Sequence, residues 1–242
     1  MGVIFFNGKS SREFHVVVEH PPAYDTPERD YEITSIPGRN GDIVHDNGGF
    51  KNVDRVYDLG IDARKYGFSR TVGAVMSWLR SASGYARLED SYDRDYYRMA
   101  YYKEPASVEN IFNEAGRVTV TFSCMPQRFY KQGEIPLEFT ESANLLNFTP
   151  FPAKPLITVT MDPRNDGSLT IGDYVMYFAG DSSEEGTPVN IVLDCDIQDA
   201  YIGTHNWNNR VSGKFPQLDP GDNHLSFTGI DKVTIIPRWW TI

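Results

Sequence analysis

Short runs in which apolar and polar residues alternate dominate this chain of 242 residues. In the clearest run, residues 117–124, Val118, Val120, Phe122 and Cys124 alternate with hydroxyl residues, so a strand there would carry an apolar row on one face. Related patterns predict strands at residues 14–18, 53–61, 96–102, 156–161, 174–179, 189–194 and 232–236. Glycine and proline separate these runs, which is typical of an all-β protein.

One segment, residues 69–82, has a helical period instead. Val72, Val75, Met76 and Leu79 fall at positions i, i+3, i+4 and i+7, and they predict a short helix with one apolar side. The fold class expected from the whole pattern is therefore all-β with one short helix.

The ends of this helix are predicted from its capping residues, with Ser69 as the N-cap and Gly84 as the stop. Trp78 lies beside the apolar stripe, where its ring would cover the edge of a sheet and its N–H would meet a carbonyl. Two roles are open for the helix. It either plugs the end of a β-sandwich or takes part directly in assembly.

After the helix, residues 85–102 predict a β-hairpin with a charged tip. Tyrosines are concentrated in it: Tyr92, Tyr96, Tyr97, Tyr101 and Tyr102. Tyrosine gives a large amphipathic contact area and is enriched at interfaces, so these five residues are a candidate subunit interface. Ordinary packing of the strands on both faces is the alternative.

The composition changes at residues 141–155, which carry several prolines and no clear period before the next strand. We therefore expect a domain boundary near residue 140, with an N-terminal domain at 1–140 and a C-terminal domain at 141–242. The chain length also agrees with two domains, each large enough to have its own core.

The charge balance excludes several classes of protein. With 33 acidic and 23 basic residues, the formal charge of -10 argues against a protein that binds nucleic acid through the phosphates. Apolar runs are far shorter than the roughly 20 residues that cross a bilayer, so no membrane partner is expected. The first residues lack a basic leader and a cleavage site, and we expect synthesis in a cytoplasm.

Candidate catalytic and metal-binding groups are scattered. The five histidines include no i, i+4 pair, and the calcium-like loop 162–173 has Arg164 where an oxygen ligand belongs, which favours a β-turn. Nucleophile elbows and phosphate-binding loops are also missing from the sequence. We expect no enzyme activity, no metal and no cofactor. Cys124 and Cys195 fit buried core residues better than a disulfide.

The loop 199–213 is rich in asparagine around a tryptophan. Trp207 with Asn206, Asn208 and Asn209 could stack on a sugar ring and hydrogen-bond its hydroxyls. The alternative is that asparagine and glycine form turns while Trp207 anchors the loop on the sandwich.

Several motifs, taken in order, resemble the distal tail proteins of long non-contractile-tailed bacteriophages, the siphophages. They are IPGRNG at 36–41, LEDSYD at 88–93, the strand VNIVLD at 189–194, FPQLDPGDN at 215–223 and KVTIIPRWWTI at 232–242. Each motif consists of turn-forming residues next to a strand, a pattern that many proteins share. The resemblance therefore depends on the combination of the motifs. It covers most of the chain.

This resemblance implies an N-terminal ring-forming domain with a β-sandwich, a helix at 69–82 and a long β-hairpin at about 85–102, followed by a C-terminal galectin-like β-sandwich. It implies a virion structural protein at the tail tip, assembled in the host cytoplasm, that forms a homo-hexameric ring as the baseplate hub. The implied partners are the tail tube protein, the tail-associated fibre or lysin protein and a receptor-binding protein. DNA would only pass through the ring. The alternative function is a carbohydrate-binding β-sandwich module for recognition of the host cell wall.

Overall fold

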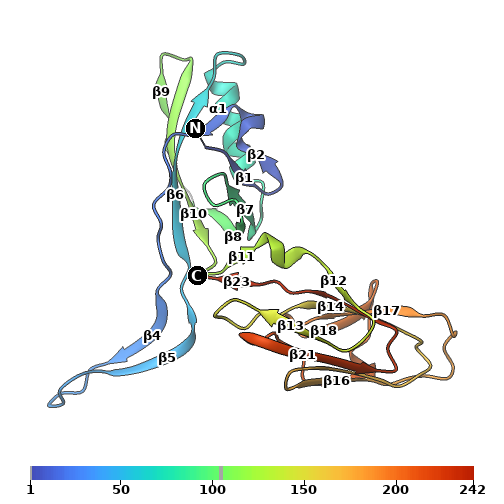
Figure 1. Ribbon diagram of the computed structural model, residues 1–242. Helices are drawn as coiled ribbons and strands as arrows, with labels where there is room; N and C mark the ends of the chain where they lie inside the picture. The colour runs from blue at the N-terminus through green and yellow to red at the C-terminus, as the bar shows by residue number, and fades with distance from the viewer. Residues whose placement is uncertain (1, 104–105) are drawn as a thin grey trace. The chain divides into compact units, whose positions relative to one another are not determined.

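The computed structural model describes residues 2–103 and 106–242, and the chain divides into two compact units (Figure 1). Unit 1 comprises Met1–Arg128 with the terminal Ile242, and unit 2 comprises Phe129–Thr241. The boundary expected near residue 140 falls inside unit 2, between β12 (Leu137–Phe139) and β13 (Ala143–Asn147), because β12 already pairs with a strand of that unit.

Unit 1 has a main antiparallel sheet in the strand order β2-β1-β7-β8-β10-β6-β3, with β9 paired to β10 and β4 paired to β5 in a separate hairpin. Its elements are β1 (Ile4–Phe6), β2 (Lys9–Ser10), the 3-10 helix η1 (Ser11–Phe14), β3 (Val16–Val18), β4 (Arg29–Thr34), β5 (Ile43–Phe50), β6 (Val53–Asp62), α1 (Phe68–Leu79), β7 (Ala86–Asp90), β8 (Tyr96–Lys103), β9 (Glu109–Ile111) and β10 (Ala115–Cys124).

The main sheet curls until its two ends meet. Gly2, just before β1, exchanges two backbone hydrogen bonds of 3.0 Å with Val18 in the edge strand β3. The enclosed core contains Phe6 and Phe122, whose ring centroids lie 4.9 Å apart, and the buried Tyr57. One curled sheet thus supplies the facing walls of the core in unit 1.

The strand predicted at 117–124 is confirmed as part of β10, and Val118, Val120, Phe122 and Cys124 are all buried as predicted. The alternation ends at Ser123, which is buried as well. The run at 14–18 was predicted too long. Phe14 ends η1, and the left-handed His15 (φ 57°) separates it from β3.

The predicted helix is present, and its apolar side faces the core. Val75 and Leu79 are buried, and Val72 and Met76 pack against the same core. The hydrogen bond expected for Trp78 is confirmed, because its Nε1 donates to the carbonyl of Phe6 at 3.1 Å. Its ring is buried in the core of unit 1.

Both predicted ends of the helix were wrong. The N-cap is Gly67 at φ 82°, a conformation that glycine adopts readily, and Ser69 lies inside the helix. The helix ends at Leu79 with Arg80 as its C-cap, before Gly84 is reached.

The hairpin predicted at 85–102 is formed by β7 and β8, but it lies inside the main sheet between β1 and β10. The hairpin that stands apart is β4–β5, which we call the arm (Figure 1). Sequence analysis predicted no strand in the arm. The IPGRNG motif forms its tip, where Arg39 N–H donates to the carbonyl of Ile36.

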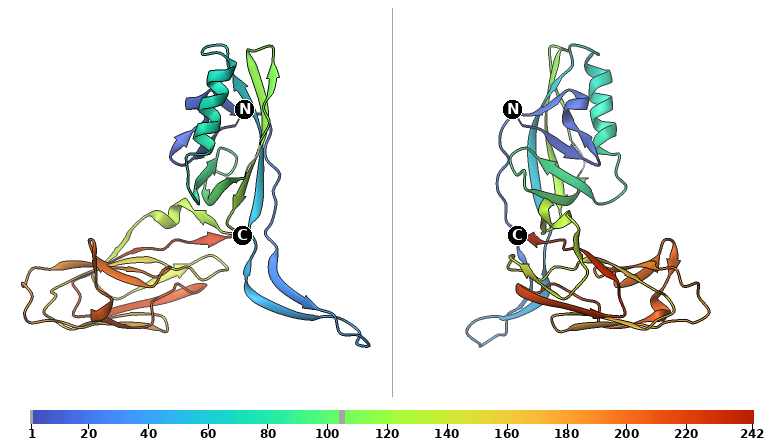
Figure 2. Two further views of the ribbon diagram at one scale, coloured as in Figure 1. Left: turned by 180° about the vertical axis from the view of Figure 1, so that it is seen from behind. Right: turned by 45° about the vertical axis from the view of Figure 1, so that its right-hand side comes forward.

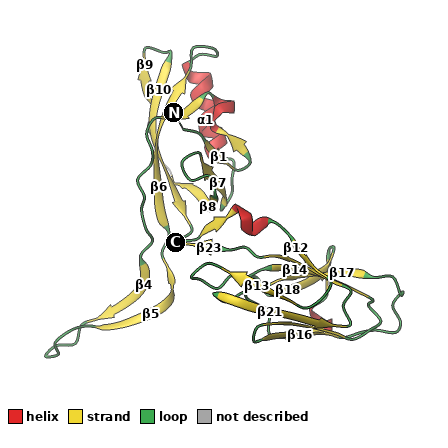
Figure 3. Ribbon diagram, viewed as in Figure 1, coloured by secondary structure: helices red, strands yellow, loops and turns green. Residues whose placement is uncertain are grey.

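Unit 2 is a sandwich of two antiparallel sheets, ordered β12-β22-β14-β17-β18-β19 and β13-β21-β15-β16-β20 (Figure 3). Its elements are β11 (Arg128–Tyr130), the 3-10 helix η2 (Lys131–Glu134), β12 (Leu137–Phe139), β13 (Ala143–Asn147), β14 (Leu156–Met161), β15 (Gly167–Ile171), β16 (Tyr174–Phe178), β17 (Val189–Asp194), β18 (Asp199–Ile202), β19 (His205–Asn206), the 3-10 helix η3 (Asn208–Arg210), β20 (Val211–Gly213), β21 (Gly221–Thr228), β22 (Lys232–Ile236) and β23 (Trp240–Thr241).

The core of unit 2 lies between these sheets, with Val159 and Ile235 from one and Leu169 and Phe178 from the other. The strands predicted at 156–161, 189–194 and 232–236 are β14, β17 and β22, with the predicted bounds. The all-β fold class with a helix is therefore confirmed.

Candidate interaction surfaces

The arm carries an exposed apolar face. Ile33 and Val44 are directly opposite each other, and Tyr31 lies two residues from Ile33 on the same face. Their exposed fractions are 46% for Tyr31, 62% for Ile33 and 56% for Val44. Three adjoining apolar side chains this exposed on an isolated two-stranded ribbon indicate a contact surface.

The base of the arm is held by a charged contact. Arg29 donates two hydrogen bonds to one carboxylate oxygen of Asp46, at 3.0 and 2.8 Å, and its guanidinium lies over the Phe50 ring. Hydrogen bonds from Arg29, and then one from the N–H of Gly48, lower the pKa of Asp46 below its ordinary value. Asp46 lies across from Tyr31, at the end of the apolar face. The opposite face of the arm is more polar, with Glu32 across from His45, and it carries one exposed apolar residue, Ile43, across from Thr34.

The five tyrosines predicted as an interface have different environments. Tyr102 packs on the core against Phe122, and the rings of Tyr96 and Tyr97 lie under the guanidinium groups of Arg128 and Arg87, at 4.1 and 3.9 Å. These three side chains are therefore already in contact within unit 1.

Tyr92 and Tyr101 are the more exposed of the five, at 42% and 39%. The ring of Tyr101 makes an edge contact with the ring of Tyr85. The ring of Tyr92 packs against Gly2, where the Cβ of any other residue would lie only 2.3 Å from a ring atom. These two side chains have surface left for a partner.

The LEDSYD motif has a structural role at the turn between β7 and β8. Asp90 Oδ1 accepts hydrogen bonds from the backbone N–H groups of Tyr92 and Asp93, at 2.8 and 2.9 Å. Its other oxygen accepts from Tyr57 at 2.8 Å and pairs with Arg55 at 3.3 Å. Burial and then the Asp90 charge raise the pKa of Tyr57, which keeps this hydroxyl protonated as a donor.

In unit 2, the loop around Trp207 uses its polar atoms internally. Asn208 donates to Asp199 at 2.7 Å and accepts from Ala200 N–H at 2.7 Å, and Asn206 accepts from Asn208 N–H. The half-buried Trp207 packs against the core under the Arg210 guanidinium. Asn209 is exposed. This geometry favours a loop anchor over a sugar site.

The FPQLDPGDN motif forms a second ordered turn. Asn223 is buried and donates to the carbonyls of Leu145, Asp219 and Gly221, while its own oxygen accepts from Asp219 N–H. Leu218 is fully buried and pairs with Ala153. The motif therefore joins β13 to β21 at the rim of the sandwich.

The described residues hold no group of three or more His, Cys, Asp or Glu side chains arranged to bind a metal. In the calcium-like loop, Arg164 donates hydrogen bonds to Asp162, and these bonds lower the pKa of Asp162 to about 2. Cys124 and Cys195 are free and buried, and burial raises the pKa of each thiol to about 12.

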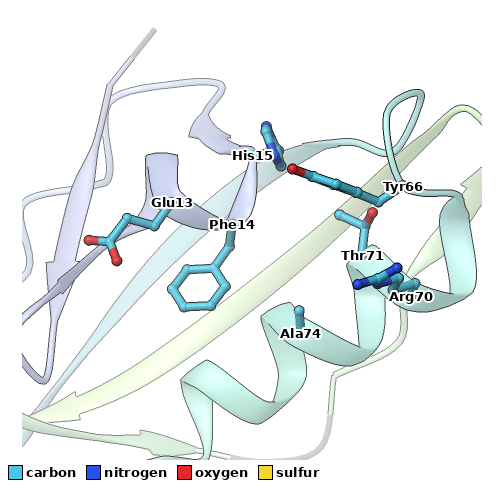
Figure 4. Close-up of a pocket in the computed structure, with 7 residues that line it drawn as sticks. All are labelled: Glu13, Phe14, His15, Tyr66, Arg70, Thr71 and Ala74. Atoms are coloured by element: carbon cyan, nitrogen blue, oxygen red, sulfur yellow. The ribbon is translucent and has the colours of Figure 1, made fainter.

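A surface pocket of about 310 Å³ lies between η1 and the first turns of α1 (Figure 4). We call it the α1 pocket. It is lined by Glu13, Phe14, His15, Tyr66, Arg70, Thr71 and Ala74. Sequence analysis did not identify this pocket, because η1 and α1 are brought together only by the curl of the sheet.

In the described part of the chain, the one α-helix is too short to traverse a bilayer.

Comparisons with known proteins identify the fold of this chain but do not assign the chain to a family. No family model matches the chain, and no curated protein matches it by sequence. Among solved structures, it matches the crystal structure of the SPP1 Dit (gp 19.1) protein, described as a paradigm of the hub adsorption apparatus in phages that infect Gram-positive hosts. The TM-score is 0.76 at 11% identity, over 100% of both chains. Both units of this chain thus follow the fold of a phage Dit hub protein, the fold that the motif resemblance predicted.

Proposed function

We propose that this protein is a distal tail protein, a structural component of a phage tail tip that forms the hub of the baseplate. The observation that carries the proposal is the fold match to the SPP1 Dit protein, which extends over the full length of both chains. A match confined to one unit would fit many β-sandwich proteins, but both units in the same order narrow the choice.

The proposed assembly is a homo-hexameric ring built by unit 1. The arm supports this proposal, because its apolar face is exposed in the single chain and a neighbouring copy would cover it. A ring also protects strand edges that would otherwise invite uncontrolled pairing. The exposed Tyr92 and Tyr101 are a second proposed contact between copies.

The proposed partners are the tail tube protein on one side of the ring and a tail-associated fibre or lysin protein on the other, with a receptor-binding protein at the periphery. DNA would pass through the ring without sequence-specific contacts. The formal charge of -10 favours such passage, because a phosphate backbone is not held by an acidic protein. Catalysis and a cofactor have no part in this proposal.

Light scattering and negative-stain microscopy of the purified protein test the ring. We expect a mass about six times that of one chain at high protein concentration, and rings with a central channel on the grid. The Ile33→Asp variant should remain folded and lose the rings. A wild-type protein that is strictly monomeric at high concentration, with no rings visible, would contradict the proposal.

A further inference from the structure

The turn between β9 and β10 presents a phenylalanine in an unusual way. Phe112 and Asn113 have φ angles of 51° and 62°, and Glu114 N–H donates to the carbonyl of Ile111 at 3.1 Å. Positive φ at both central residues is the pattern of a type I′ turn, in which asparagine, aspartate and glycine are preferred. A bulky aromatic residue in this conformation is an outlier.

Phe112 is also 93% exposed, the largest exposed fraction among the large hydrophobic residues described. Backbone strain and solvent exposure both oppose phenylalanine here, while the rest of the turn is well built. Asn113 N–H donates to Asn110 Oδ1 at 2.9 Å, and the two side chains share a further hydrogen bond of 2.8 Å. The turn therefore holds the aromatic ring out in solvent, as an anchor for a partner requires.

The α1 pocket has the properties of a receptor for such a ring. Phe14, Tyr66 and Ala74 supply aromatic and apolar walls (Figure 4). The Phe14 ring is stacked on the buried Trp78 ring at 4.8 Å, so this wall is fixed by the core. The pocket is thus preformed, which lowers the entropic cost of binding.

The charges around the two features are complementary. Glu109 and Glu114 flank Phe112, and residues 109–114 contain no basic side chain. Two charged residues line the α1 pocket, Arg70 beside Tyr66 and Glu13 on the far side of Phe14 (Figure 4). Arg70 and Lys65 both lie over the ring of Tyr66, at 5.7 and 4.8 Å, so the Tyr66 side of the rim is basic. Opposite charges at the rim favour approach in the right orientation.

Phe112 and the α1 pocket also belong to the same end of unit 1. In all views the β9–β10 turn and the start of α1 lie at this end, with α1 on one side of the sheet (Figures 1 and 2). Because Phe112 projects and the α1 pocket is recessed at the same end of the subunit, Phe112 of one copy can meet the pocket of the next copy in a head-to-tail contact. Contacts of this kind can close into a ring.

We propose that Phe112 of one copy inserts into the α1 pocket of the next copy. The inference rests on the proposed ring and adds a specific contact to it, in which the acidic flanks of Phe112 meet Arg70 and Lys65.

Cross-linking between two singly substituted copies tests the contact and leaves Phe112 in place. Copies with Glu114→Cys are mixed with copies with Arg70→Cys, and a short bismaleimide is added. Native cysteines do not interfere, because both are buried. We expect covalent dimers in the mixture and none with either copy alone. A matched mixture in which Ile197→Cys, an exposed site in unit 2, replaces Glu114→Cys should give no dimer.

Two variants then measure the contact by assembly. Phe112→Asn places a residue that tolerates positive φ in the turn, so the variant should be at least as stable as the wild type. The protein concentration at which half of the chains are assembled should rise about tenfold or more. Ala74→Trp fills the α1 pocket and should have the same effect. Ser77→Trp, on an exposed position of α1 outside the pocket, is the control and should assemble normally.

Rings that form at the wild-type concentration in both Phe112→Asn and Ala74→Trp would overturn this contact and leave the proposed function intact. Rings without a Glu114→Cys to Arg70→Cys cross-link would do the same. A wild-type protein that forms no ring at all would overturn the proposed function, and this inference with it.

Discussion

The hydroxyl of Tyr57 donates a 2.8 Å hydrogen bond to the buried carboxylate of Asp90 in the interior of unit 1. The same carboxylate accepts from two backbone N–H groups of the β7–β8 turn and pairs with Arg55. One acidic side chain therefore connects β6 to a turn far away in the sequence.

Removing either partner of this bond should destabilise unit 1 by different amounts. Tyr57→Phe deletes one hydrogen bond to a charged group and should lower the free energy of unfolding by about 2 kcal/mol. Asp90→Ala also leaves Arg55 buried without its ion pair, and the loss should reach about 3 kcal/mol or more. Urea denaturation checks both values. Tyr31→Phe, on the exposed arm, is the control and should change nothing; equal losses in all three variants would refute this account.

Asn223 should be a main support of the rim of unit 2. Asn223→Ala leaves buried backbone groups of the turn without partners, so we expect a loss of about 2 to 3 kcal/mol in the free energy of unfolding. Asn144→Ala, which removes an exposed amide on the paired strand, is the matched control and should cost under about 0.5 kcal/mol. A stable Asn223→Ala variant would show that water replaces these hydrogen bonds.

The two faces of the arm should differ in their effect on assembly. Ile33→Asp places a charge on the apolar face and should abolish rings, with the free energy of unfolding changed by less than about 0.5 kcal/mol because the side chain is exposed. Thr34→Asp adds the same charge one residue later, on the opposite face, and should leave the rings intact. Light scattering of each variant measures ring assembly, and a thermal melt measures its stability. Rings that survive Ile33→Asp would remove the arm from the proposed interface.

Both thiols should be unreactive in the folded protein. Burial raises the pKa of Cys124 and Cys195 to about 12, so a thiol reagent at pH 8 meets no thiolate until the chain unfolds. We expect negligible labelling in buffer and labelling of both cysteines in urea. Rapid labelling of the native protein would mean that a core opens easily.

The same shifts predict how stability depends on alkaline pH. A thiol whose pKa is higher in the folded state than the ordinary 9.0 contributes stability that is fully present below about pH 9 and is lost as the pH rises toward about 12. Unfolding of wild type should therefore become easier across this window. A double Cys→Ala variant, measured in parallel, should show a shallower decline.

The sequence by itself determined the features that depend on local pattern. Alternation located β10, β14, β17 and β22, because a strand between a core and solvent must alternate. The helical stripe of α1 followed from spacing in the same way, and Trp78 beside it donates to a backbone carbonyl as expected. The Dit-like fold was expected from the resemblance of the motif combination to distal tail proteins, and the match to the SPP1 Dit structure confirms that fold.

Only the tertiary structure decided which surfaces are free. Tyr101 and Tyr102 point to opposite faces of β8 because side chains alternate along a strand, but only the curled sheet determines that the face of Tyr102 meets the core and the face of Tyr101 meets solvent. In the arm, β4 alternates Tyr31 and Ile33 with polar residues, but β5 has no such period, and neither strand packs on a core within the chain. Sequence analysis therefore missed this hairpin. The α1 pocket and the Gly2–Val18 closure require the sheet to curl, and curling depends on long-range pairing that no local pattern encodes.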